Sequence, residues 1–198
     1  MKAKETAIVL IEFQNEFCKP DGKLYGVVKD EIARLNTVAN AVKLAKEARA
    51  KGALIIHSPF VMDENWVNQQ CMVGIIKGAK EGGAFKPGAW GTELIDELKP
   101  QPGDVVLTGK RALSGFSNTE LKAILDKHKI KNVVCAGFLA NVCVEATARS
   151  AYDYGFHVTV ARNAVASGAK TTQDYVEKEI YPVLGQALSV DEVIKALE

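Results

Sequence analysis

The stretch NVVCAGFLANVCVEATARSAYDYGFHVTVA, residues 132–161, contains a complete strand–helix–strand pattern. Its apolar runs at 132–137 and 157–161 are typical of buried strands, and between them a helical pattern begins at Cys143 and ends before Gly155. Strands connected through a helix lie parallel, and near-continuous apolar strands have helices on both faces. The stretch therefore predicts a layered α/β fold.

The rest of the chain continues this alternation of strands and helices. Further strands are expected at 6–12, 53–57 and 104–108. Helices are expected at 30–51, 92–98, 117–129, 171–184 and from 189 onward. Two of them begin with a capping box, Ser117 with Glu120 and Ser189 with Glu192. We predict one domain over residues 1–198, a three-layer α/β/α structure with a mostly parallel, Rossmann-like sheet.

The composition excludes several classes of function. The chain has 198 residues and a net charge of +1, which gives no electrostatic reason for a nucleic-acid or membrane partner. No apolar run approaches the ~18 residues of a membrane span, and the run near the N-terminus is too short for a signal peptide. The four cysteines form no Cys-x-x-Cys pair, and a chain of this size needs no disulfides. We therefore expect a cytoplasmic protein.

Three chemically complementary residues follow predicted strands: Glu12, Lys110 and Cys143. The carboxyl ends of parallel strands meet at one edge of the sheet, so these side chains are expected to lie together. A helix N-terminus and a nearby cation lower the pKa of a thiol, and a carboxylate can take its proton and return it to a leaving amine. Singly, each residue also has an ordinary explanation in packing or solvation. Together they predict acyl transfer from a small amide to water.

Three segments carry a resemblance to a known family: IVLIEFQNEFC (8–18), GKRALSGFSNTEL (109–121) and VCAGFLANVCVEATARSAYDYGFHVTVARNAVAS (134–167). Their order and spacing resemble the isochorismatase-like cysteine hydrolases, which include nicotinamidases and N-carbamoylsarcosine amidases, over nearly the whole chain. The resemblance implies an Asp–Lys–Cys triad on a parallel α/β sheet. Lys110 matches the lysine of the triad and Cys143 the nucleophile, whereas Glu12 stands at the position of the aspartate.

The resemblance also implies details of the site and of the reaction. A cis peptide bond is expected between Phe138 and Leu139, and the backbone amides of Leu139 and Cys143 would form the oxyanion hole. The expected reaction is hydrolysis of a C–N bond in a small amide or ureido substrate through a thioester. Because isochorismatases proper lack the nucleophilic cysteine and cleave a vinyl ether, Cys143 favours the amidase branch. Members commonly assemble, so a homo-oligomer is expected.

The sequence departs from the family pattern at two places. Glu12 is one methylene longer than aspartate, which leaves two alternatives: an enzyme with a reshaped pocket, or a family-fold protein with weak or no activity that binds a small molecule or a partner.

Nicotinamidases bind a divalent ion through an Asp-x-His motif, but here IIHSPFVMDENW contains His57 alone. We therefore predict no metal. No cofactor is expected either, since EFQNEF follows the first strand in place of a glycine-rich dinucleotide motif.

Aromatic side chains near these segments are the candidates for the wall of a substrate pocket. The predicted pocket residues are Phe17, Phe60, Trp66 and Phe116. Core packing is the competing explanation for each of them.

Overall fold

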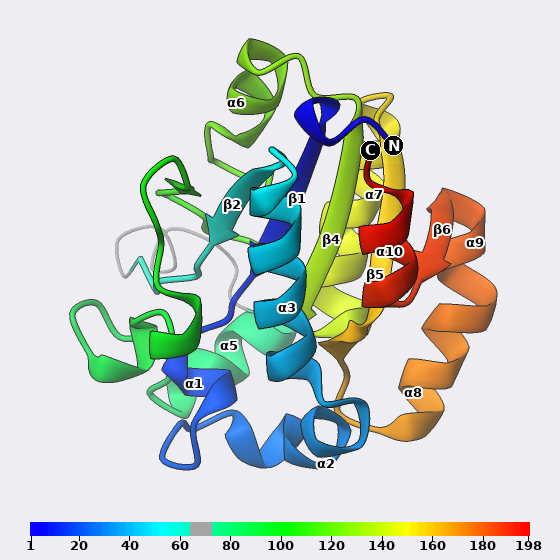
Figure 1. Cartoon of the computed structure of the whole chain (residues 1–198). Helices are drawn as coiled ribbons and strands as arrows, with labels where there is room; N and C mark the ends of the chain where they lie inside the picture. Colours follow the sequence, from blue (N-terminus) through cyan, green and yellow to red (C-terminus); the bar gives the residue numbers. More distant parts are fainter. Residues whose placement is uncertain (64–72) are drawn as a thin grey trace.

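The computed structural model describes residues 1–63 and 73–198, and its six strands form one parallel sheet (Figure 1). The strands are β1 (Thr6–Ile11), β2 (Leu54–Ser58), β3 (Val105–Val106), β4 (Asn132–Phe138), β5 (His157–Ala166) and β6 (Gly185–Leu188). Their order is β3-β2-β1-β4-β5-β6, and every pair of neighbours is parallel. The predicted fold class is confirmed.

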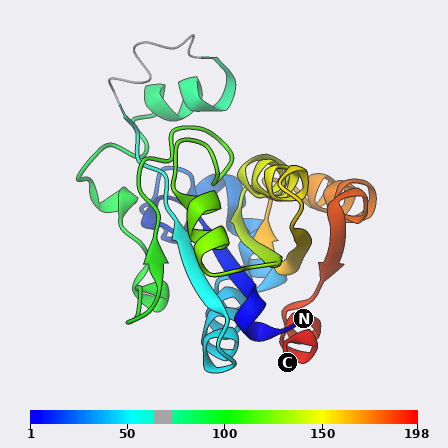
Figure 2. The same ribbon diagram turned by 90° about the horizontal axis from the view of Figure 1, so that it is seen from above.

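Helices cover both faces of the sheet (Figures 1 and 2). One layer contains α2 (Tyr25–Leu35), α3 (Thr37–Ala50) and α10 (Val190–Ala196). The opposite layer contains α6 (Leu121–Lys127), α7 (Glu145–Asp153) and α9 (Tyr181–Leu184). Further helices are α1 (Asn15–Cys18), α5 (Gly74–Glu81) and α8 (Lys170–Tyr175). All six residues of β1 are buried, because successive side chains enter the two layers alternately.

The strand order determines where a ligand can bind. From β1 the chain proceeds to β2 and β3 on one side, and from β4 it proceeds to β5 and β6 on the other. The chain connections after β1 and after β4 therefore lead to opposite sides of the sheet, and a crevice lies between the carboxyl ends of these two strands. Such a crevice is the usual ligand position in an open α/β sheet.

Several elements differ from those expected from the sequence. The predicted helix 30–51 is two helices, because Asn36 adopts a left-handed conformation (φ 53°) that asparagine tolerates. The helix expected at 92–98 is replaced by two short 3₁₀ turns, Trp90–Thr92 and Asp96–Leu98. β3 has only two residues, and β6 was not expected because its short sequence, GQAL, carries a weak apolar pattern.

One of the two predicted capping boxes is present. At α10 the amide of Glu192 donates to Ser189 Oγ, and the amide of Ser189 donates to Glu192 Oε2 at 2.7 Å. The box expected from Ser117 and Glu120 is wrong: α6 begins later, at Leu121, and its N-cap has no side-chain hydrogen bond. No helix in the described residues has the length and apolar character of a membrane span.

Gly137 permits a close approach between the two central strands. Its Cα pairs with that of Ile11, and its φ of +131° belongs to a region that only glycine adopts readily. A Cβ atom added there would lie 1.9 Å from the carbonyl oxygen of Ile11. This approach lies directly before Glu12 on one strand and before the Phe138–Leu139 peptide bond on the other.

Gly137→Ala is expected to lower the free energy of unfolding by about 3 kcal/mol or more, since backbone strain adds to overpacking against a carbonyl group. Urea denaturation would measure the loss. The matched control is Gly26→Ala on α2, where an added Cβ has no atom within 4 Å and should cause no loss. Equal losses in the two variants would contradict the packing argument.

Candidate active site

The structure brings Glu12, Lys110 and Cys143 together at the divergence of the sheet. Glu12 directly follows β1, and Cys143 belongs to the turn that leaves β4. Lys110 follows Gly109, which has a φ of +75° and where an added Cβ would lie 2.8 Å from the carbonyl oxygen of Asn118. All three side chains are buried, with residue exposures of 3%, 2% and 8%. The contact between residues so distant in sequence thus agrees with the expectation from the strand ends.

Glu12 and Lys110 form a buried ion pair. Lys110 Nζ donates to Glu12 Oε1, and the same ammonium group lies 5.1 Å from the centre of the Phe60 ring. Burial alone would lower the pKa of Lys110, but the charge of the Glu12 carboxylate and its hydrogen bond to the ammonium group raise the pKa. Lys110 therefore stays a cation at neutral pH.

The Cys143 thiol lies beside Glu12, the acidic partner of the ion pair. Its side chain lies within hydrogen-bonding reach of Glu12 and of the backbone amide of Leu139. Burial, followed by the negative charge of Glu12, raises the pKa of Cys143 well above its usual value, and Lys110 only partly offsets this. The sequence had suggested a lowered pKa. The resting group is instead a neutral thiol beside a carboxylate, so its proton must leave as the thiol reacts, and Glu12 is in place to accept it.

The turn that carries Cys143 has an unusual backbone. The peptide bond between Phe138 and Leu139 is cis, and residues Ala140–Val144 form a π-helical segment ahead of α7. The carbonyl of Leu139 accepts hydrogen bonds from the amides of Val142 and Val144, at 3.0 and 3.1 Å. The amide of Leu139, which belongs to the preceding peptide unit, lies beside the Cys143 side chain.

Side chains of α7 attach this turn to the loop that follows Lys110. Thr147 Oγ1 donates to the carbonyl of Cys143 at 2.6 Å and accepts a hydrogen bond from the amide of Gly115 at 2.9 Å. In addition, Ser114 Oγ donates to Ser150 Oγ at 2.9 Å. The nucleophile and the lysine loop are therefore held in a fixed relation by hydrogen bonds.

A small cavity of about 40 Å³ adjoins the Cys143 sulfur. It is lined by Glu12, Phe17, Leu24, Phe60, Ile75, Ile76, Ala79, Phe85, Ala112, Leu113, Leu139 and Cys143. Two of the predicted pocket residues, Phe17 and Phe60, belong to it. Phe116 does not line it, because its ring packs against those of Tyr154 and Phe156 at centroid distances of 5.3 and 6.4 Å. The fourth, Trp66, lies outside the described residues.

The sequence reasoning missed helix α5 and Phe85 as parts of this wall. Ile75, Ile76 and Ala79 share one face of α5, and their spacing in GIIKGAKE was a usable signal for an amphipathic helix. Phe85 follows a glycine-rich turn and adopts a positive φ of 55°, which no sequence pattern would have indicated.

Two polar residues of α1 and its N-cap hold the aromatic wall. Gln14 donates through Nε2 to the carbonyl of Phe60 and accepts at Oε1 from the amide of Phe60, both at 2.8 Å. The buried carboxylate of Glu16 accepts a hydrogen bond from the amide of Phe85 at 2.8 Å. The Phe60 and Phe85 rings then meet edge to face at 5.2 Å. Gln14 and Glu16 therefore act as supports of the cavity.

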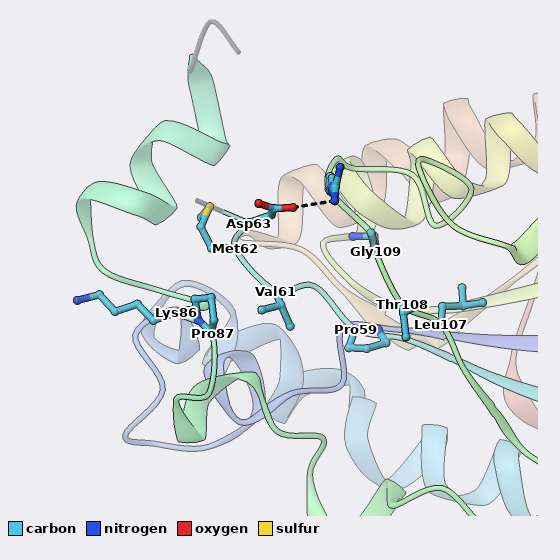
Figure 3. Close-up of a pocket in the computed structure, with 11 residues that line it drawn as sticks. Pro59, Val61, Met62, Asp63, Lys86, Pro87, Leu107, Thr108 and Gly109 are labelled. Atoms are coloured by element: carbon cyan, nitrogen blue, oxygen red, sulfur yellow. Dashed lines mark ion pairs between the residues drawn. The ribbon is translucent and has the colours of Figure 1, made fainter. Parts of the chain in front are cut away.

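A larger, more open hollow of about 800 Å³ lies on the Lys110 side of the ion pair (Figure 3). It is lined by Pro59, Val61, Met62, Asp63, Lys86, Pro87 and residues 107–111. Within it Arg111 pairs with Asp63 at 2.9 Å, and Figure 3 shows the side chain of Lys86 extending away from the hollow. Cys143 does not line this hollow, whereas it does line the small cavity.

The described residues contain no cluster of three or more histidine, cysteine, aspartate or glutamate side chains suited to a metal. His57 is the histidine that stands where nicotinamidases have their Asp-x-His motif. Its Nε2 lies 3.4 Å from Asp104 Oδ2, which also pairs with Arg49 at 2.7 Å. His57 thus belongs to a structural cluster beside α3. The absence of a metal stays a prediction.

Comparisons with known proteins agree with this geometry. The Isochorismatase domain family matches residues 6–192. Curated relatives named ureidoacrylate amidohydrolase RutB include those of Pseudomonas syringae pv. syringae, 31% identical over 97% of this chain and 83% of the relative, and of Agrobacterium fabrum, 32% identical over 77% and 72%.

Solved structures are similar to this chain in fold as well as in sequence. A cysteine hydrolase from Pseudomonas syringae pv. phaseolicola aligns with a TM-score of 0.85 and 25% identity over 98% of this chain and 93% of the other. N-carbamoylsarcosine amidase from Thermoplasma acidophilum aligns with a TM-score of 0.76 and 28% identity over 96% and 98%.

Proposed function

We propose that this chain, which belongs to the isochorismatase family and holds a buried Glu12–Lys110–Cys143 group, is a cysteine-dependent hydrolase. It would cleave a non-peptide C–N bond in a small amide or ureido substrate. The observation that carries the proposal is the position of Glu12, which contacts both the Lys110 ammonium group and the Cys143 thiol. The amidohydrolase relatives support the reaction class. The same contact supports a working enzyme over a binding protein that shares the fold.

The proposed reaction begins with proton transfer from Cys143 to Glu12 as the sulfur attacks the carbonyl carbon of the substrate. The negative charge that develops on the carbonyl oxygen is stabilised by the backbone amides of Leu139 and Cys143. Collapse of the tetrahedral intermediate breaks the C–N bond, and Glu12 returns the proton to the leaving amine. A thioester on Cys143 remains. Water, deprotonated by Glu12, then hydrolyses it and restores the thiol, while Lys110 keeps the carboxylate paired.

The proposal extends to the domain organisation, the cellular location and the assembly of the protein. We infer a single domain over 1–198 that works as a cytoplasmic homo-oligomer without a nucleic-acid partner. The match over residues 6–192 supports one domain, and the free thiols of Cys18, Cys135 and Cys143 support a reducing compartment. Sedimentation of the purified chain would measure the oligomeric state.

The decisive test of the proposal is detection of the thioester. Wild-type protein is mixed with a panel of small amides and ureides, amine or ammonia release is followed, and acid-quenched samples are analysed by mass spectrometry. We expect release of amine together with an acyl adduct on the peptide that contains Cys143. The Cys135→Ala variant, altered at a buried cysteine inside β4, is expected to behave like wild type in both readouts. Turnover without an adduct in any quench would contradict the covalent route.

A further inference from the structure

The small cavity beside Cys143 has a polar end and an apolar body. Its polar side chains are Glu12 and Cys143, which belong to the reacting group. The remaining wall is formed by aliphatic and aromatic side chains from α1, α5 and several loops. Among the described residues, no side chain of this wall outside the reacting group can donate a hydrogen bond to a substrate.

Among the described residues, three positive charges near the cavity are paired with carboxylates. The ammonium group of Lys110 is paired with Glu12, and Arg111 is paired with Asp63 and lines the other hollow. On α5, Lys77 lies 3.8 Å from Glu81.

A carboxylate is therefore a poor occupant of this cavity. An anion removed from water needs a cation or several donors to replace its hydration, and the described wall offers neither. An apolar group, by contrast, gains from every methylene that leaves water. Cys143 lines this cavity and not the larger hollow, which favours the cavity as the place of the group attached to the carbonyl carbon.

We propose that the substrate is an uncharged amide with a short, apolar acyl group, and that Ile76 and its neighbours on α5 select against acids. This inference rests on the proposed function and narrows it. It also separates the chain from relatives named for ureidoacrylate, which is a carboxylate. Along a series of unbranched amides, kcat/KM is expected to rise about three- to fourfold per added methylene until the cavity is full.

The charge preference can be measured with isosteric substrates. 4-Methylpentanamide and succinamate have the same chain length and branching, and differ in an isopropyl group against a carboxylate. We expect wild-type protein to favour the uncharged amide by at least about 100-fold in kcat/KM. Ile76→Arg, on a helix without buried residues, should fold and reduce this preference at least about tenfold by supplying a cation.

The matched control is Val61→Arg, which places the same charge in the larger hollow and should leave the preference unchanged. If Val61→Arg shifts the preference and Ile76→Arg does not, the substrate occupies the larger hollow and the inference is wrong. Faster hydrolysis of succinamate by wild-type protein would also overturn it, while leaving the proposed hydrolase intact. Failure to release ammonia from any amide or ureide in a Cys143-dependent manner would instead refute the proposed function itself.

Discussion

Cys143→Ala is expected to lower kcat/KM for amide hydrolysis by about 10³-fold or more, because it removes the atom that forms the thioester. Glu12 and Lys110 remain paired in this variant, and the backbone donors of the turn are untouched. Any residual rate would come from substrate positioning and from these donors. Steady-state kinetics on the best substrate of the amide panel would measure the loss.

The control for this variant separates chemistry from folding. Cys143 is small and lies at the edge of a cavity, so its truncation should cost only about 1 kcal/mol of stability. Cys135→Ala removes a fully buried sulfur from β4 and should lose a similar amount of stability while retaining its rate. If Cys143→Ala keeps near wild-type activity, the nucleophile is misassigned, and chemistry that needs only Glu12 and Lys110 would have to replace the thioester.

The fold was predictable because its signals are local. Continuous apolar runs separated by helical patterns indicate a parallel sheet under helices, and β1, β4 and β5 all occur where such runs stand. The parts that were missed have weak local signals. The edge strand β6 pairs with only one neighbour and carries few apolar residues, and the break at Asn36 depends on one backbone conformation.

The sequence predicted those parts of the site that the order and direction of the strands determine. Glu12, Lys110 and Cys143 each come after a strand, so the parallel sheet alone brings them to one edge. The cavity wall depends on tertiary contacts, which no spacing rule contains. Phe116 looked equivalent to Phe60 in sequence, yet it packs against Tyr154, and the state of the Cys143 thiol reflects a degree of burial that sequence did not reveal.

The backbone at position 12 has an unusual conformation. Glu12 has a φ of 57°, its amide donates to the carbonyl of Ser58 at 3.1 Å, and its own carbonyl accepts from Gln14 at 2.7 Å. From this fixed position the carboxylate reaches both Lys110 and Cys143. The glutamate side chain thus has the length needed to reach both partners. One conservative replacement, Glu12→Asp, tests this length, and the other, Glu12→Gln, tests the charge.

Glu12→Asp is expected to lower kcat by about 100-fold, because withdrawal of the carboxylate by one methylene separates it from the Cys143 thiol. Stability is not the reason, since aspartate tolerates a positive φ better than glutamate does. A faster variant would show that glutamate is an imperfect replacement for the family aspartate. Kinetics with the same amide panel decide between these outcomes.

Glu12→Gln keeps the length and removes the charge, so it tests the role of Glu12 as the proton acceptor. Hydrolysis should fall by about 10³-fold, since a neutral amide cannot take the thiol proton. At the same time the pKa of Cys143 should fall, because the charge of Glu12 raises it in the wild type and Lys110, which lowers it, is still present. Thiolate absorbance should therefore appear at lower pH in Glu12→Gln than in wild type, with Cys143→Ala identifying the signal. A loss of rate without this shift would mean that Glu12 acts only by holding Lys110 in place.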